Sequence, residues 1–440
     1  MRKRARGQKL WQKAKSIIPG GNQLLSKRSE MFLPGGWPSY YSKAKGAHVW
    51  DLDGNKFIDM SIMGVGSCLL GYSDPDVNKA VKRAVDRGVM STLNAPEEVE
   101  LAELLCKIHP WAKMVRYARS GGEAMAIAVR IARAFSGKDK IAFCGYHGWS
   151  DWYLSANLSD RKILDGHLLP GLEPRGVPRG LKGTTLPFHY NKIGELEDIV
   201  KKHGKNIGAI VLEPMKSGEP KNDFLKKVRA ISDKIGAVLI FDEVTSGFKM
   251  TFGGAHLLFG VNPDIAVFAK AMSNGFAMAA IIGRREVMQA AQTTFISSTN
   301  WTERIGPVAA LATLKKIKKL NVARRLRQVG QSAKKIWTRQ AKKHGLEITV
   351  AGLDPLSNFT LNYGDRHQAI KTLFIQEMLA RGFLVSNMLF ASYAHTDAIL
   401  KKYEIAVDEV FGILRKALDT DSVEKRLKGP IAHIGFARLN

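Results

Sequence analysis

Two charged side chains that could do chemistry stand at the ends of two apolar runs. The run VLIF at 238–241 is followed by Asp242, and the run IAVFA at 265–269 is followed by Lys270. Short runs rich in Val, Ile and Phe, bounded by Gly, Asn and Pro, are typical of buried parallel strands. Ligands bind just beyond the carboxyl ends of such strands in open α/β sheets. We therefore expect Asp242 and Lys270 to face one ligand site.

A carboxylate and an amine at one site favour a particular cofactor. Pyridoxal phosphate needs an amine for a Schiff base and a carboxylate for its ring nitrogen. Taken singly, an Asp after a strand is more often a turn or capping residue, and a Lys there is usually a solvated loop charge. Asp242 and Lys270 together, joined to the segment upstream, favour pyridoxal phosphate.

The upstream segment has the pattern of a phosphate site. Ser120, Gly121 and Gly122 stand between a short strand pattern and a long helical pattern that begins at Glu123. Glycines let the backbone approach an anion closely, and a helix N-terminus offers N–H groups and a positive dipole. Ordinary helix caps look the same. The order strand, SGGEA, helix and then YHG at 146–148 nevertheless favours the phosphate function.

These motifs resemble those of a known family. DEVTSGF at 242–248, PDIAVFAKAMSNG at 263–275 and the apolar strand ending at Gly283 resemble the class III aminotransferases of pyridoxal phosphate fold type I. Within this family the chain resembles the branch of glutamate-1-semialdehyde aminomutase. The resemblance runs from Pro19 to Asp397 and implies an α/β fold. A large domain would hold a mostly parallel sheet flanked by helices, and a smaller α/β domain would be C-terminal.

The resemblance implies a role for each residue of the cofactor site. Asp242 would pair with the pyridinium nitrogen, and Lys270 would form the Schiff base and carry a proton during catalysis. Val244 would pack against one face of the ring and Tyr146 would stack on the other. Glu213, at the end of the strand NIGAIVLEP, would lie near the cofactor.

The phosphate group would be bound from two subunits. Ser120, Gly121 and Gly122 would bind it from their own chain, although the family usually has Thr or Ser where Gly122 stands. Ser298 and Thr299 occupy the place of a segment that, in the family, reaches the phosphate of the other subunit. The implied partners are therefore a second copy, in a homodimer with active sites at the interface, a small amino donor and a carbonyl acceptor.

Length and composition agree with a large globular enzyme. The 440 residues exceed one hydrophobic core, and we expect an N-terminal helix and hairpin segment (1–60), a cofactor-binding domain (61–315) and a small C-terminal domain (316–440). A hydrophobic content of 45% and a charged content of 24% are ordinary for such proteins. The Gly- and Pro-rich stretch at 158–187 predicts an irregular loop that serves as a lid or binding loop.

Targeting and cysteine patterns favour the cytoplasm. The basic N-terminus has no apolar run behind it, and no apolar stretch is long enough to span a bilayer. Cys68, Cys106 and Cys144 have neither metal-ligand spacing nor the pattern of a disulfide framework, so we expect no metal site.

The net charge of +27 is the unusual feature of the composition. Residues 305–346 hold twelve Lys or Arg and no acid, with apolar residues at helical spacing between them. A solvated helical surface is the preferred interpretation, although such a field could also attract an anionic substrate. A nucleic-acid-binding protein with an inactive pyridoxal phosphate fold is a distant alternative, because no DNA- or RNA-binding motif supports it.

The main functional hypothesis is transfer of an amino group from a donor, expected to be glutamate, to a keto or aldehyde acceptor. A sugar ketone or aldehyde is one candidate acceptor. The alternative is intramolecular amino transfer, as in the aminomutase branch. Three segments depart from that branch, namely LLSKR at 24–28, NWTERIG at 300–306 and LFAS at 389–392. The departures favour a different substrate.

Overall fold

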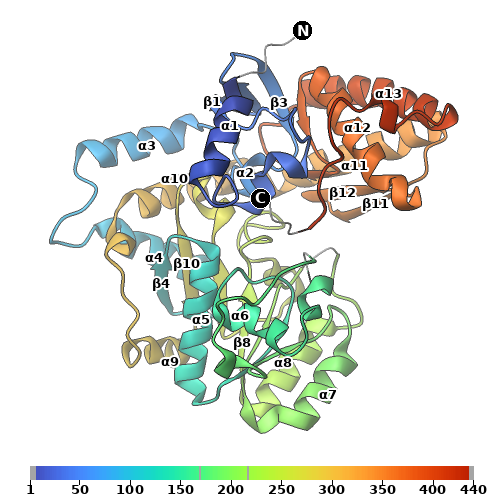
Figure 1. The fold of residues 1–440 in the computed structure, drawn as a ribbon. Coiled ribbons are helices and arrows are strands. Elements are labelled where there is room, and N and C mark those ends of the chain that lie inside the picture. The colour runs from blue at the N-terminus through green and yellow to red at the C-terminus, as the bar shows by residue number, and fades with distance from the viewer. Residues whose placement is uncertain (1–5, 168–169, 216–217, 436–440) are drawn as a thin grey trace. The chain divides into compact units, whose positions relative to one another are not determined.

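A computed structural model describes residues 6–167, 170–215 and 218–435 (Figure 1). The chain groups by internal contacts into two compact units. One unit is Pro75–Ala323, and the other joins the residues up to Asp74 with those from Arg324 onward. The three-part division expected from the sequence stays a prediction, and the contact grouping differs from it by joining the N-terminal segment to the C-terminal part.

The unit Pro75–Ala323 is built on one seven-stranded sheet in the order β4-β10-β9-β8-β7-β5-β6. Strands β9, β8, β7, β5 and β6 run parallel, and β10 is antiparallel to both of its neighbours. The strands are β4 (Met114–Ala118), β5 (Lys140–Cys144), β6 (Thr185–Pro187), β7 (Ile207–Leu212), β8 (Val238–Asp242), β9 (Ile265–Phe268) and β10 (Ala279–Gly283). The mostly parallel α/β sheet expected from the sequence is confirmed.

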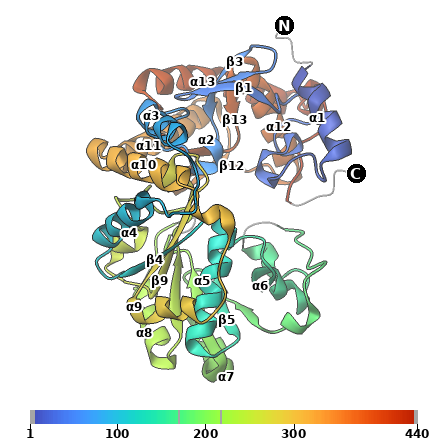
Figure 2. The ribbon, with the colours of Figure 1, turned by 90° about the vertical axis from the view of Figure 1, so that its left-hand side faces the viewer.

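Helices cover both faces of this sheet because its central strands are apolar throughout. In β8, Ile240 belongs to the hydrophobic cluster that includes helix α5, while Leu239 and Phe241 belong to the cluster that includes helix α8. Helix α5 lies along the sheet in both views (Figures 1 and 2) and contacts β7 to β10. The helices are α3 (Pro75–Asp86), α4 (Pro96–Ile108), α5 (Gly121–Ser136), α6 (Asp151–Leu154), α7 (Ile193–His203), α8 (Phe224–Ile235), α9 (Arg285–Met288) and α10 (Ile305–Leu320).

The second unit holds two smaller sheets, ordered β1-β2-β3-β13 and β11-β12-β14. Strand β13 is parallel to β3, and the other pairs in both sheets are antiparallel. The strands are β1 (Tyr41–Lys45), β2 (His48–Asp51), β3 (Lys56–Met60), β11 (Ile348–Leu353), β12 (Leu356–Leu361), β13 (Phe383–Val385) and β14 (Met388–Phe390). The helices are α1 (Arg6–Ile17), α2 (Met63–Gly66), α11 (Val322–His344), α12 (His367–Ala380) and α13 (Asp397–Asp419).

The stretch 158–187 is largely irregular, as expected, within its described residues. Short 3-10 turns lie at Ser155–Leu158, Ile163–Gly166 and Arg179–Leu181. The expectation of an irregular chain is wrong for the last three residues, Thr185–Pro187, because they pair with β5 as the edge strand β6. In the described residues no helix is long and apolar enough to cross a membrane.

Candidate active site

Four neighbouring parallel strands end at one edge of the large sheet and place charged and aromatic side chains there. Asp242 is the last residue of β8, and Lys270 follows β9 after one alanine. Glu213 comes directly after β7, and Tyr146 follows β5 by two residues. The four come from adjacent strands, so the structure brings them to one place, as the strand-end argument predicted.

Asp242 is buried and paired with a histidine. Its Oδ2 lies 2.8 Å from Nδ1 of His147, and its Oδ1 accepts a hydrogen bond from the Val244 N–H at 3.0 Å. The other ring nitrogen of His147, Nε2, lies 3.0 Å from the carbonyl oxygen of Cys144. The His147 ring thus lies between the carboxylate and the end of β5, and the carboxylate is fixed in orientation by contacts on both of its oxygens.

Lys270 is held as an amine of lowered basicity. Its Nζ donates to Oγ1 of Thr245 at 2.9 Å. Burial lowers the pKa of the Lys270 amine below its usual value, although the carboxylates of Asp242 and Glu213 act in the opposite direction. Lys270 also has a φ of +44°, a conformation that non-glycine residues rarely adopt. Backbone strain of this kind is found at sites where the side chain must point in a fixed direction.

A second buried lysine lies next to this amine. Lys249 is 1% exposed, and its Nζ donates to the carbonyl oxygen of Thr245 at 2.7 Å. Burial and, in second place, the charge of Lys270 lower the pKa of Lys249 well below its usual value. Thr245 therefore binds one lysine through its hydroxyl and the other through its carbonyl.

The glycines before α5 are needed for space. A Cβ on Gly121 would lie 2.9 Å from Cγ1 of Val244, and a Cβ on Gly122 would lie 3.2 Å from the Trp149 ring. Gly148, with a φ of +99°, approaches so closely that its Cβ would lie 2.8 Å from Cα of Gly122. The start of α5 is thus packed against Val244, which follows β8, and against the loop after β5. The two glycines themselves project no side chains there, and we call this segment the glycine cradle.

Ser120 is the N-cap of α5. Its Oγ accepts from the Glu123 N–H at 3.4 Å, and Oε2 of Glu123 accepts from the Ser120 N–H at 3.4 Å, which forms a capping box. The first N–H groups of a helix have no partner within it, so they can bind an anion. The helical start predicted for phosphate binding is therefore present.

Tyr146 and Glu213 flank the two charged residues. Tyr146 is 37% exposed and makes an edge-on contact with Tyr153, with ring centroids 5.7 Å apart. Burial, and then the charge of Asp242, raise the pKa of its hydroxyl. A Cβ on Gly145 would lie 2.8 Å from Oε2 of Glu213, so the strand end after β5 needs a glycine to accommodate that carboxylate.

Ser298 and Thr299 are exposed and join none of these contacts within the chain. They precede Trp301, whose Nε1 donates to Oε1 of Glu123 at 3.0 Å on the first turn of α5. The sequence assigned them to the phosphate of a second subunit, and that role stays a prediction.

Sequence reasoning missed three residues of this site. The motifs assign no role to His147, Thr245 or Lys249. The sequence offers a signal for Thr245 and Lys249, since the two are four residues apart and both follow Asp242 within the stretch DEVTSGFK. Nothing in the sequence shows that His147 reaches Asp242, because 95 residues separate them.

Comparison with known proteins identifies the family. The family model of the class III aminotransferases matches residues 35–388. The chain belongs to this family and is a pyridoxal phosphate-dependent enzyme of amino-group transfer.

Individual relatives cover almost the whole chain. A 3-aminobutyryl-CoA aminotransferase of Cloacimonas acidaminovorans is 30% identical over 94% of this chain and 99% of its own length. A glutamate-1-semialdehyde 2,1-aminomutase of Thermodesulfovibrio yellowstonii is 31% identical over 93% of this chain and 99% of its own. A solved structure of a transaminase with PLP bound has a TM-score of 0.82 and 25% identity, and covers 93% of this chain and 97% of its own.

The residues present fit this cofactor. A buried carboxylate, an amine of lowered pKa and a glycine cradle at a helix N-terminus supply one group for each part of pyridoxal phosphate. Gly121 and Gly122 allow Val244 and Trp149 to pack against the first turn of α5, whose leading N–H groups can bind an anion.

The lowered pKa of Lys270 can be measured in cofactor-free protein. Pulse labelling with acetic anhydride across a pH series, read by mass spectrometry, should show half-maximal reaction of Lys270 at lower pH in folded than in urea-unfolded protein. The reason is that burial disfavours the ammonium form, so the reactive neutral amine persists at lower pH. An equal or higher midpoint in the folded protein would contradict this electrostatic description.

Proposed function

We propose that the protein transfers the amino group of glutamate to the carbonyl carbon of a keto or aldehyde acceptor, with Lys270 and Asp242 as catalytic residues. The observation that carries the proposal is the placement of both residues at the ends of adjacent parallel strands, with Asp242 held in position by its contact with His147. Ser120, Gly121 and Gly122 would bind the cofactor phosphate. Val244 and Tyr146 would flank its ring, with Glu213 nearby.

The residues divide the work by their chemistry. Pyridoxal phosphate, when bound, supplies the electron sink that makes proton loss next to an amino group feasible. Asp242 would bind a ring nitrogen in its protonated form, because His147 and the Val244 N–H hold the carboxylate in one orientation. Lys270 would hold the cofactor through its amine, and the freed amine would accept the proton from the substrate Cα and donate it to the cofactor carbon C4′. Thr245 would position the Lys270 amine through its hydroxyl.

The second candidate is intramolecular amino transfer of the aminomutase type. It is supported by the likeness to the Thermodesulfovibrio protein over nearly the full length of both chains. The substituted segments at 24–28, 300–306 and 389–392 weigh against it, because they replace the branch's own residues. A sugar ketone or aldehyde stays one hypothesis for the acceptor.

The assembly and location belong to the same proposal. Ser298 and Thr299 are exposed and lie on a segment tied to α5 by Trp301, which supports a homodimer in which they complete the partner's phosphate site. Three free cysteines support a reducing compartment, and we propose the cytoplasm.

Lys270→Ala should abolish amino transfer, because the amine that forms the Schiff base and moves the proton is lost. We expect turnover to fall by at least roughly 10²–10⁴-fold. Borohydride should fix the cofactor covalently to the wild-type chain but not to this variant, as seen by mass spectrometry. Lys201→Ala, an exposed lysine on α7, is the matched control and should behave as wild type. Retained transamination by Lys270→Ala would refute the assignment.

Asp242→Asn should slow the chemical step while the fold is kept. Loss of the carboxylate removes the charge that keeps a ring nitrogen protonated, and we expect a fall of roughly 10²–10³-fold in kcat. Single-turnover absorbance with glutamate measures the step directly. Asp198→Asn, an exposed carboxylate on α7, serves as the control. Wild-type rates for Asp242→Asn would exclude the proposed role.

Glutamate should convert the yellow holoenzyme to a form with the shorter-wavelength absorbance of the aminated cofactor, in the absence of any acceptor. Adding candidate keto acids, aldehydes and sugar ketones one at a time should then restore the yellow colour for the acceptor class that is used. A yellow band that ignores glutamate would mean another donor or the aminomutase reaction. The absorption spectrum therefore tests glutamate as the amino donor.

A further inference from the structure

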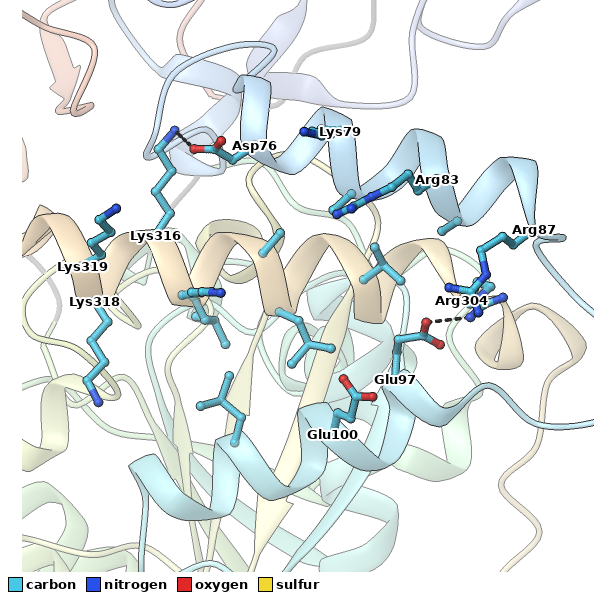
Figure 3. A pocket seen from close by; sticks show the side chains of 18 of the residues that line it. Asp76, Lys79, Arg83, Arg87, Glu97, Glu100, Arg304, Lys316, Lys318 and Lys319 are labelled. Carbon is cyan, nitrogen blue, oxygen red and sulfur yellow. Dashed lines mark hydrogen bonds and ion pairs between the residues drawn. The ribbon is translucent and has the colours of Figure 1, made fainter.

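A groove on the unit Pro75–Ala323 lies between α3, α4 and α10 and is not used by the proposed reaction (Figure 3). Its volume is about 1570 Å³. None of the residues proposed to bind the cofactor lines it. We call it the α3–α10 groove.

Two rows of cations border the α3–α10 groove. Lys79 and Arg83 are four residues apart on α3, so they share one face of that helix about 6 Å apart along its axis, and Arg87 lines the groove just past the end of α3. Lys315 and Lys319 on α10 are also four residues apart and line the groove as well. All five side chains are exposed. The two cationic rows come from the two helices that form the upper part of the groove (Figure 3).

The acids of the groove do not balance these cations. Eight Lys or Arg line it against four Asp or Glu. Two of the acids are already paired with groove cations, since Lys316 Nζ lies 2.6 Å from Asp76 Oδ2 and Arg304 Nη2 lies 2.6 Å from Glu97 Oε1. The cationic rows on α3 and α10 are therefore the excess charge.

The wall between the cations is apolar. Val308, Leu311 and Ala312 line the groove from α10, with Leu104 from α4 and Ala80 from α3. All five are half-buried, so part of each side chain meets solvent within a single chain. An apolar strip flanked by charge is the surface that binds the apolar face of an amphipathic helix.

We propose that the α3–α10 groove binds an acidic amphipathic helix of a partner protein. The α10 segment from Arg304 to Lys319 spans about 23 Å at 1.5 Å per residue, which matches a helix of about four turns. Apolar side chains at i, i+3, i+4 and i+7 would cover the strip, and flanking Asp and Glu would meet the cationic rows. The net charge of +27 adds electrostatic attraction for such a partner.

Other anions fit the groove less well. Lys79 and Arg83 are about 6 Å apart along α3 and Arg87 follows past the end of that helix, so the row does not converge on a single small anion. Single-stranded nucleic acid needs aromatic surfaces for base stacking. The groove offers one aromatic ring, Phe252, and Lys318 Nζ already lies 5.8 Å from its centroid.

The proposal can be tested on the full-length holoenzyme with a defined peptide. The probe is a fluorescein-labelled 16-residue helix-forming peptide with Leu at i, i+3, i+4 and i+7 and Glu on both flanks, followed by fluorescence anisotropy at low salt. A scrambled peptide of the same composition controls for charge alone. We expect the amphipathic peptide to bind at least about tenfold more tightly than the scrambled one, because only it can bury its leucines against the strip.

Two neighbouring residues on α3 give matched variants. Arg83 lines the groove, whereas Lys82 is exposed and does not line it. Arg83→Glu should weaken peptide binding by about tenfold, since attraction becomes repulsion, and Lys82→Glu should change it by less than about threefold. Leu311→Asn should weaken the amphipathic peptide but leave the scrambled one unchanged. The absorbance of the bound cofactor should stay that of wild type in all three variants.

Three outcomes would overturn the proposal. Equal effects of Arg83→Glu and Lys82→Glu would show non-specific attraction to a basic surface. Tighter binding of a single-stranded oligonucleotide of equal charge, lost in Arg83→Glu, would assign the groove to nucleic acid. A change of sedimentation coefficient in Arg83→Glu alone would assign it to an interface between copies of this chain. None of these readouts depends on the donor or acceptor.

Discussion

The buried pair of Asp242 and His147 is the interaction on which the site depends. A carboxylate at the end of a parallel strand could turn in several directions, but His147 binds one oxygen and the Val244 N–H binds the other. Because the second ring nitrogen of His147 is bound to the Cys144 carbonyl, the pair ties the ends of β5 and β8 together. The carboxylate is thereby fixed in orientation before any ligand binds, and such preorganisation is what the proposed role of Asp242 requires.

The sheet around this pair must meet two opposed requirements. Strands buried on both faces must be apolar, while the chemistry requires charge. The chain places the charges at the ends of the strands, where the carboxylate of Glu213 still acts electrostatically on the amine of Lys270. Thr245 then accepts hydrogen bonds from two lysines, so both buried amines have a polar partner. Burial itself lowers the pKa of the Lys270 amine, and this direction suits the proton transfer proposed for it.

The excess positive charge of the protein does not lie at the proposed catalytic residues. Acidic and basic residues both lie near Asp242, whereas the α3–α10 groove carries an excess of Lys and Arg on its exposed rims. Solvated charges of this kind contribute little to stability, and their effect is on association with oppositely charged molecules. A basic surface beside an electrically balanced site is consistent with an enzyme that acts on small molecules and also binds an acidic partner.

The sequence by itself determined the parallel sheet and the identity of the residues at the ends of its strands. Apolar runs that end in Asp242 and Lys270 can be found by inspection, because burial on both faces leaves no polar residue within a strand. The glycines before Glu123 were also predictable, although their reason was not: only the tertiary structure shows that Val244 and Trp149 fill the space of a side chain there. The approach of His147 to Asp242, the binding of Lys249 and Lys270 to one threonine, and the pairing of β6 with β5 were likewise decided by tertiary structure. Each of these contacts depends on which strands are neighbours, and strand order follows from packing of the whole sheet, which no local pattern encodes.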